Sequence, residues 1–288
     1  MKKTIRRLFR LLLLGAALWL GALLVRIFVC DRFIVPSDSM APTLVAGDRI
    51  LANKLIVGAR IYRRLEFGCD IPLHAFRMPG VRRVRPGDVV VFNAPHGYDR
   101  GRIEFRINYV YSKRCIGAPG DTIAIRDAFF RNSSHPEPLG DTLAQRRLRE
   151  TPDSLLSRRV LRAMPYDGSR IGWTIKEMGP LIVPRRGLRI PLDTLTCPLY
   201  RTAIEYETGK TLQWSDGTPR LGGEPLEAYS FRGDWYFFCG DNVADSKDSR
   251  YLGFVPEEFI IGVVRRIGRS EEPGSGHSRP ERRWKRVE

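Results

Sequence analysis

A long apolar segment close to the N-terminus limits what this chain of 288 residues can fold into. Residues 11–29 are apolar except for Arg26, and the unbroken part is Leu11–Val25. Fifteen helical residues rise about 22 Å, whereas the hydrocarbon core of a bilayer is about 30 Å thick. Leu8, Phe9 and the residues after Arg26 complete the length if the flanking arginines reach the two interfaces. The segment therefore predicts a membrane-spanning helix.

A cleaved signal peptide also combines a charged start with an apolar centre. Its cleavage site needs small residues two positions apart just after the apolar part, but Arg26–Val29 is bulky. Cys30 also lacks the small neighbour of a lipoprotein processing site. We therefore predict an uncleaved transmembrane anchor over residues 11–29.

The cations around this segment predict its orientation. Residues 1–10 contain five cations and no acid, whereas residues 31–49 contain only two cations, Arg32 and Arg49. By the positive-inside rule, the basic N-terminus lies in the cytoplasm and everything after Val29 lies outside. No second long apolar run exists, so we predict a single-pass protein of the cytoplasmic (inner) membrane.

The chain has 48 Lys and Arg against 32 Asp and Glu, a formal net charge of +16. Such an excess suits a protein that faces nucleic acid or anionic lipid. The cations are scattered, however, without a zinc, helix-turn-helix or RNA-binding pattern, so we expect no nucleic-acid partner. An apolar fraction of 43% with 28% charged residues excludes wholesale disorder.

The five cysteines are dispersed and form no CxxC pair, which argues against a zinc site and thioredoxin-like chemistry. A disulfide between Cys69 and Cys197 is conceivable. We favour the alternative, four buried thiols and one spare.

Beyond the anchor, short β-rich runs alternate with turns that contain Gly, Pro and Asp, which predicts a mainly β, barrel-like or sandwich fold. The expected strands are Arg49–Leu55, Asp88–Phe92, Asn108–Ile116, Thr122–Arg126, Leu181–Val183, Trp235–Cys239 and Phe259–Ile267.

One stretch outside the anchor, Asp141–Arg162, has a helical pattern, and Pro152 should break it. It lies in a more polar region, residues 127–232, which we interpret as an inserted subdomain. The β-domain would then comprise residues 31–126 and 233–268, followed by a basic, mobile tail over residues 269–288.

Three segments carry the chemistry. Pro36–Leu44 contains Ser39, Tyr111–Asp121 contains Lys113, and Gly240–Arg250 is a polar loop. Taken singly, the first could be an ordinary turn and the second an exposed edge-strand cation. The third could be a solvated loop or a calcium loop, although its ligand spacing does not fit an EF-hand.

Together and in this order, these segments resemble bacterial type I signal peptidases, membrane-bound serine endopeptidases that remove signal peptides from exported preproteins. The resemblance covers about half the chain, namely the anchor, Phe33–Leu55, Arg85–Phe92, Tyr109–Ile125 and Trp235–Val264. It implies an all-β signal-peptidase-like catalytic domain with Ser39 as nucleophile and Lys113 as general base. It also implies that the Ser37 hydroxyl assists the oxyanion hole and that Ser246 hydrogen-bonds the lysine.

The same resemblance implies that Asp248 and Arg250 form a charge pair that braces the third segment. Two departures from the family pattern occur. Val243-Ala244-Asp245 stands where Arg-Asp-Asn is usual, and Ser112 stands where an apolar residue is common. The first affects loop bracing and the second the pocket shape, but neither removes a catalytic group.

The residues suit these roles chemically. A serine hydroxyl needs a base within hydrogen-bond reach, and none of the four histidines lies in a motif, which leaves the Ser-Lys variant. A lysine with the usual pKa of about 10.4 is protonated, so burial must lower that pKa by about 2–3 units. Tyr111, Ile116 and the apolar residues Phe33–Val35 are available to bury Lys113.

We expect the substrate to bind as an extended strand between Phe33–Ser37 and Asn108–Ser112, with small side chains entering pockets. The expected binding residues are Ile34, Val35, Met40, Leu44, Tyr111 and Ser112. The implied partners are preprotein signal peptides with a small-x-small cleavage site, the lipid bilayer and protein-export machinery. No metal or other cofactor is needed.

Two alternatives from other classes of protein remain. A soluble self-cleaving repressor shares the Ser-Lys logic, but the anchor and the lack of a DNA-binding segment argue against it. A catalytically silent, membrane-tethered β-domain that binds exported proteins would have the same fold. It is favoured only if Lys113 is charged and exposed to solvent.

Overall fold

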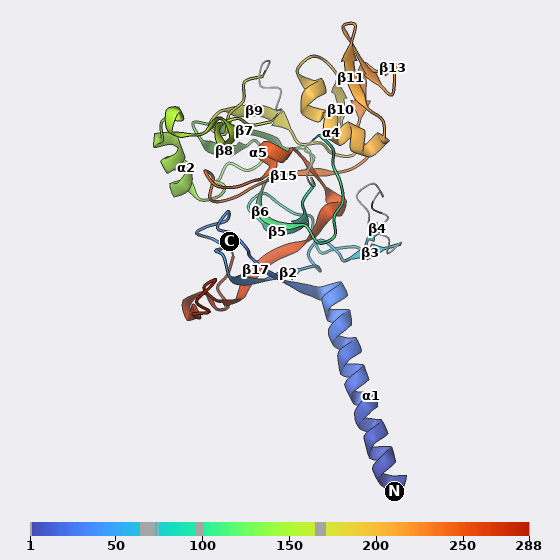
Figure 1. Cartoon of the computed structure of the whole chain (residues 1–288). Coiled ribbons are helices and arrows are strands. Elements are labelled where there is room, and N and C mark those ends of the chain that lie inside the picture. Colours follow the sequence, from blue (N-terminus) through green and yellow to red (C-terminus); the bar gives the residue numbers. More distant parts are fainter. Residues whose placement is uncertain (1, 64–72, 74, 96–100, 165–170, 288) are drawn as a thin grey trace.

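The computed structural model describes residues 2–63, 73, 75–95, 101–164 and 171–287 (Figure 1). A long helix, α1 (Lys2–Leu24), stands apart from a mainly β body and continues into a five-residue π-helix, η1 (Val25–Val29). Residues 6–29 have a mean hydropathy of up to 2.3 and are exposed, so this helix is long and apolar enough to cross a membrane. The expected apolar helix is thus present.

The body is organised around one curled antiparallel sheet (Figure 1). Its strand order is β1 (Cys30–Ile34), β2 (Asp48–Asn53), β17 (Ile260–Ser270), β5 (Val89–Asn93), β6 (Val110–Gly117), β15 (Trp235–Cys239) and β16 (Val255–Pro256). Strand β1 follows the π-helix directly and forms the edge of the sheet.

The burial of each strand reflects its sequence pattern. Strand β2 alternates between buried and more exposed residues, as expected of a strand with one face against the core. Every residue of β5 and of β15 is buried, because both faces of these central strands are covered. The predicted mainly β class is confirmed.

Smaller elements cover this sheet. Two of them are three-stranded sheets, with the strand orders β8 (Phe129–Asn132), β7 (Thr122–Arg126), β9 (Met178–Ile182) and β11 (Leu212–Ser215), β12 (Thr218–Leu221), β13 (Glu224–Pro225). Two are strand pairs, β3 (Arg60–Tyr62) with β4 (Ala75–Arg77) and β10 (Arg189–Pro191) with β14 (Ala228–Ser230). The remaining elements are the helices α2 (Thr142–Glu150), η2 (Asp153–Leu155), α3 (Arg158–Leu161), α4 (Thr196–Thr208), α5 (Ser249–Leu252), η3 (Glu257–Phe259) and η4 (Pro280–Arg282).

The expected helical stretch is present and breaks at Pro152, between α2 and the short helices that follow. Asp141 caps α2 by accepting a hydrogen bond of 2.6 Å from the backbone N–H of Ala144. Helix α4 was not predicted. It ends at Gly209, whose φ of +68° suits glycine.

Residues 127–232 share their core with the central sheet. Met178 and Tyr200 from this region belong to the same buried cluster as Ile116 of β6 and Phe237 of β15. One hydrophobic core thus joins both parts. The division into a catalytic domain and an inserted subdomain stays a prediction about how the sequence is divided.

The C-terminal tail, whose composition predicted a mobile segment, packs against the body in this structure. Val287 is buried, and its N–H donates to the carbonyl of Arg265 in β17. Arg282 forms an ion pair of 2.6 Å with Asp48, whose carboxylate is fully buried at the start of β2. Burial alone would raise the pKa of Asp48, but the Arg282 guanidinium holds it below its usual value. A buried carboxylate thus holds the tail in place.

Replacing Arg282 with alanine should lower the free energy of unfolding by about 2 kcal/mol, because the Asp48 carboxylate would stay buried without its cation. The measurement is the urea-unfolding midpoint of the purified full chain in detergent. Arg283→Ala, an exposed neighbour, is the control and should have little effect. Equal effects of the two variants would contradict this role of Arg282.

Candidate active site

Ser39 and Lys113 meet although 74 positions separate them in the chain. Ser39 lies in the turn after β1, Lys113 lies in the middle of β6, and a hydrogen bond joins Lys113 Nζ to Ser39 Oγ. Ser37 Oγ lies 3.4 Å from Ser39 Oγ, at the limit of hydrogen-bond distance. The three side chains that were expected to act together at a serine centre therefore do lie together.

The amine of Lys113 is shielded from water. The residue is 4% exposed, and its Nζ lies 5.6 Å from the centre of the Tyr111 ring. Burial lowers the pKa of Lys113 to about 8; the negative charge of Asp248 opposes this shift and the positive charge of Arg250 adds to it. A useful fraction of this lysine is thus neutral near physiological pH.

The turn that carries Ser39 is held against the Gly240 loop. The N–H of Asn242 donates to the Ser39 carbonyl at 3.3 Å, and its side-chain amide donates to the Asp38 carbonyl at 3.2 Å. A Cβ on Gly240 would lie 2.3 Å from the Ser39 carbonyl oxygen and 2.2 Å from Ser246 Oγ. Glycine at position 240 is therefore what allows this close approach.

A second link was not anticipated from the sequence. Arg114, next to Lys113, makes two buried hydrogen bonds to the Asp241 carboxylate at 2.8 and 2.6 Å. Thr43, four residues after Ser39, donates its hydroxyl proton to the same carboxylate. Arg114 and Asp241 stand in the motifs that were singled out, but their sequence positions alone did not show that they pair. The pair joins all three motif segments.

Asp248 and Arg250 form the ion pair that the resemblance implied. Both side chains are fully buried, with 2.8 Å between Arg250 Nη2 and Asp248 Oδ2. Burial alone would raise the pKa of Asp248, but the Arg250 guanidinium keeps it below its usual value. Arg250 also donates to the carbonyl of Val243 at 2.7 Å. Because this contact uses the backbone, the unusual side chain at position 243 does not remove it.

Ser246 differs from its expected role. Its hydroxyl is buried, but it makes no hydrogen bond to Lys113 within the part of the chain that the structure describes. The Lys113 amine instead contacts Ser39 directly. The expectation that Ser246 hydrogen-bonds the lysine is therefore not met in this conformation.

A cleft of about 1030 Å³ opens onto Ser39 and Lys113. Five of the six residues expected to bind substrate line it: Ile34, Val35, Met40, Tyr111 and Ser112. The sixth, Leu44, does not: it is 0% exposed and packs in the core beneath the Ser39 turn. Its assignment to substrate binding is wrong, because the turn directs this apolar side chain inward.

Two strand edges border the cleft. Strand β1 is an edge strand that pairs only with β2 in its sheet. Strand β6 pairs with β15 from Arg114 onward, and the part of β6 from Val110 to Lys113 lines the cleft. These edges can accept an extended peptide.

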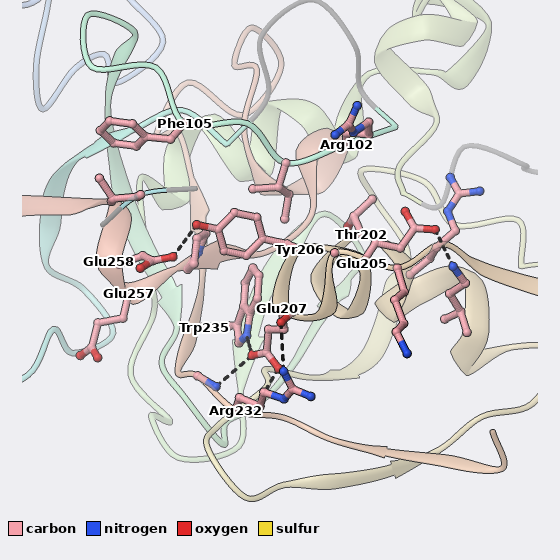
Figure 2. A pocket seen from close by; sticks show the side chains of 18 of the residues that line it. Arg102, Phe105, Thr202, Glu205, Tyr206, Glu207, Arg232, Trp235, Glu257 and Glu258 are labelled. Carbon is pink, nitrogen blue, oxygen red and sulfur yellow. Dashed lines mark hydrogen bonds between the residues drawn. The ribbon is translucent and has the colours of Figure 1, made fainter. Parts of the chain in front are cut away.

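A separate cavity of about 970 Å³ lies beside α4 and contains neither Ser39 nor Lys113 (Figure 2). Two of its acidic groups, Glu207 and Glu258, have internal partners. The Glu207 carboxylate accepts hydrogen bonds from Trp235 Nε1 and the Gly233 N–H, both at 2.9 Å, and Tyr206 donates to the Glu258 carboxylate. These carboxylates therefore stabilise the fold of this region.

Four of the five cysteines lie in the described part of the chain. Cys30, Cys115, Cys197 and Cys239 are free thiols. Cys197 is therefore not in the disulfide with Cys69 that the sequence allowed, and Cys69 itself lies outside the described residues.

Comparisons with known proteins agree with this geometry. The sequence profile of the family described as "Signal peptidase, peptidase S26" matches residues 5–267. Signal peptidase I of Rickettsia massiliae is 30% identical over 250 residues, which cover 85% of this chain and 74% of that protein. Signal peptidase I of Buchnera aphidicola is 27% identical over 84% of this chain and 70% of that protein.

Among solved structures, a signal peptidase I from Enterococcus faecalis V583 is 17% identical, with a TM-score of 0.29 over 64% of this chain and 98% of that chain. The family profile spans the anchor, the Ser39 turn, β6 and the Gly240 loop. This chain therefore belongs to the signal peptidases of peptidase family S26, hydrolases that cut peptide bonds.

Proposed function

We propose that this protein is the serine endopeptidase that cuts signal peptides from exported preproteins at the outer face of the cytoplasmic membrane, with Ser39 and Lys113 as a catalytic dyad. Membership of the family supports signal-peptide cleavage. The observation that carries the dyad is the hydrogen bond between Ser39 and a lysine that is 4% exposed. In the alternative, a catalytically silent binding domain, Lys113 would be a solvated cation on an edge strand. That alternative does not fit the burial of Lys113.

The neutral amine of Lys113 would take the proton of Ser39 Oγ as this oxygen attacks the carbonyl carbon of the scissile bond. The same proton would then pass to the leaving amine, which departs as the mature protein. Water, deprotonated by Lys113, would hydrolyse the acyl-enzyme that remains on Ser39. The dyad alone thus supplies the base and the acid for both steps.

The negative oxygen formed during each attack needs hydrogen-bond donors. The N–H of Ser39 makes no hydrogen bond within the described part of the chain, and the Ser37 hydroxyl lies 3.4 Å from Ser39 Oγ. Both can donate to this oxygen, and one such donor typically contributes about 3–4 kcal/mol to transition-state stabilisation.

The cleft fits an extended substrate. The edges of β1 and of the first half of β6, which border the cleft, would pair with the backbone of a peptide lying between them. Val35 and Met40 are almost fully buried and line the cleft near Ser39, so they leave room only for small side chains. The anchor would hold this cleft where the apolar helix of a signal peptide leaves the bilayer.

Ser39→Ala should abolish cleavage of a peptide with an Ala-x-Ala site, because the attacking oxygen is removed. Ser37→Ala should be milder, with a loss of roughly 10²-fold in kcat, since the Ser39 N–H remains. The measurement is turnover of purified variants with unchanged circular dichroism. More than a few per cent of activity in Ser39→Ala would exclude Ser39 as the nucleophile.

Lys113→Arg should be as inactive as Lys113→Ala, because a guanidinium keeps its proton at any relevant pH. In the wild type, the lowered pKa of about 8 places the acidic limb of the kcat/KM profile near pH 8. Below that pH the rate should fall about tenfold per unit as Lys113 gains its proton. An active Arg variant would show that charge, and not a free amine, is what this position provides.

The membrane orientation is tested with protease added to cells whose outer membrane has been made permeable. If residues 1–10 are cytoplasmic, the body after Val29 should be digested. A tag fused to the N-terminus should stay protected in the same cells. Full protection of the body would refute this orientation.

A further inference from the structure

The proposed active-site cleft has two ends with different surroundings. One end lies beside the anchor, where η1 leads directly into β1 and where Arg26 and Lys54 line the cleft (Figure 1). The other end is formed by the Gly240 loop (residues 240–250), which contributes Asp245 and Lys247 to the cleft wall. Strand β1 runs from the anchor to the Ser39 turn, and the loop contacts this turn, so the attacking oxygen lies between the two ends.

The direction of a bound preprotein follows from this arrangement. In the function proposed above, the apolar helix of the signal peptide lies in the bilayer that the anchor spans. The residues before the scissile bond therefore enter the cleft from the anchor end. The residues after the scissile bond, which begin the mature protein, leave the cleft past the Gly240 loop. This loop is thus placed to contact the mature protein and not the signal peptide.

The backbone of the Gly240 loop is held against the Ser39 turn. The N–H of Asn242 donates to the Ser39 carbonyl at 3.3 Å, and the N–H of Asp245 donates to the Asn242 carbonyl at 3.0 Å. The N–H of Gly240 donates to the buried carboxylate of Asp248 at 2.9 Å. Because these contacts fix the loop, the backbone that carries Asp245 keeps one position relative to the nucleophile.

The two charged residues of the loop share one wall of the cleft. Ser246, which stands between them in the sequence, is 7% exposed and directs its hydroxyl into the body. Asp245 and Lys247 are both exposed and both line the cleft. A peptide that passes this wall therefore meets a negative and a positive group within a short stretch of its chain.

Two described acids line the cleft, and they differ in their partners. Asp31, at the anchor end, forms ion pairs with Arg26 at 3.1 Å and with Lys54 at 3.3 Å. Asp245 and Lys247 form no ion pair and no side-chain hydrogen bond with any other residue that the structure describes. A charge without an internal partner attracts the opposite charge on whatever binds beside it.

We propose that Asp245 and Lys247 form two subsites of opposite charge for the first residues of the mature protein, so that this protease distinguishes preproteins by the charge that follows the cleavage site. Asp245 favours a cationic side chain there, and Lys247 favours an acidic one. Position 245 is one of the departures from the family pattern, so this acid is a property of this chain. The proposal rests on the function proposed above and adds the recognition of the leaving part of the same substrate.

The experiment measures kcat/KM of the purified full chain in detergent with peptides that share one Ala-x-Ala site. A single lysine or a single glutamate is placed in turn at each of the first four positions after the site, in an otherwise uncharged sequence. A second set carries the same charges before the site. The test variants are Asp245→Asn and Lys247→Gln. The matched controls are Asp216→Asn, in the turn between β11 and β12, and Lys210→Gln, just after α4; both residues are exposed and lie outside the cleft wall.

We expect Asp245→Asn to lower the lysine-to-glutamate ratio of kcat/KM about threefold at a position after the site, as for exposed charge pairs. Lys247→Gln should raise this ratio by a similar factor, and both shifts should disappear in about 0.5 M salt. The controls should leave every ratio unchanged.

A ratio that stays the same in Asp245→Asn and in Lys247→Gln at every position after the site would overturn the proposal. Shifts confined to charges before the site would also overturn it, because the loop would then contact the signal peptide. Equal shifts in the controls would show that net charge is responsible and would overturn it as well. If the wild type cleaves none of the peptides, the proposed function itself is contradicted, and this inference with it.

Discussion

The proposed role of Lys113 requires an amine that can give up its proton near neutral pH, and such an amine has to be kept away from water; the arrangement of the sheet around Lys113 meets this requirement. The lysine lies where β6 passes between β5 and the start of its pairing with β15, with the Tyr111 ring on one side. Burial is the largest influence on its pKa. The residues of this region thus surround the Lys113 side-chain nitrogen and keep it away from water.

Charges close to such a nitrogen would cancel the effect of burial unless they were paired. The two charged pairs next to Lys113 are Arg114 with Asp241 and Asp248 with Arg250, and each is buried and close to neutral as a unit. They carry many hydrogen bonds to loop backbones, such as those to Gly87, Val243 and Gly240. The site is therefore braced by ionic contacts, and at Lys113 the positive charge of Arg250 opposes the negative charge of Asp248.

The parts of this structure that could be predicted are those with a strong local signal. Strand β15 has the predicted bounds, Trp235–Cys239, which follow its aromatic run, and the helical stretch breaks at Pro152. Strand β1 was missed because its sequence continues the anchor without a turn. Helix α4 was missed because its apolar residues are mixed with polar ones and a proline stands in its first turn.

The candidate site, too, has parts that could be predicted from the sequence and parts that could not. The nearness of Ser39 and Lys113 followed from a family resemblance, since no local pattern places residues 74 positions apart side by side. The inward direction of Leu44 and the pairing of Arg114 with Asp241 depend on how turns fold against each other, which a single sequence does not reveal.

The tail has a consequence for how the protein matures. Arg282 donates to the Thr43 carbonyl, in the turn that follows Ser39, and Arg279 donates to the Ala46 carbonyl. These partners lie more than 230 positions earlier in the chain. A nascent chain that still lacks residues 279–282 therefore lacks these contacts to the Ser39 turn. Segments from both ends of the described β body thus have to be present before this turn has all its partners.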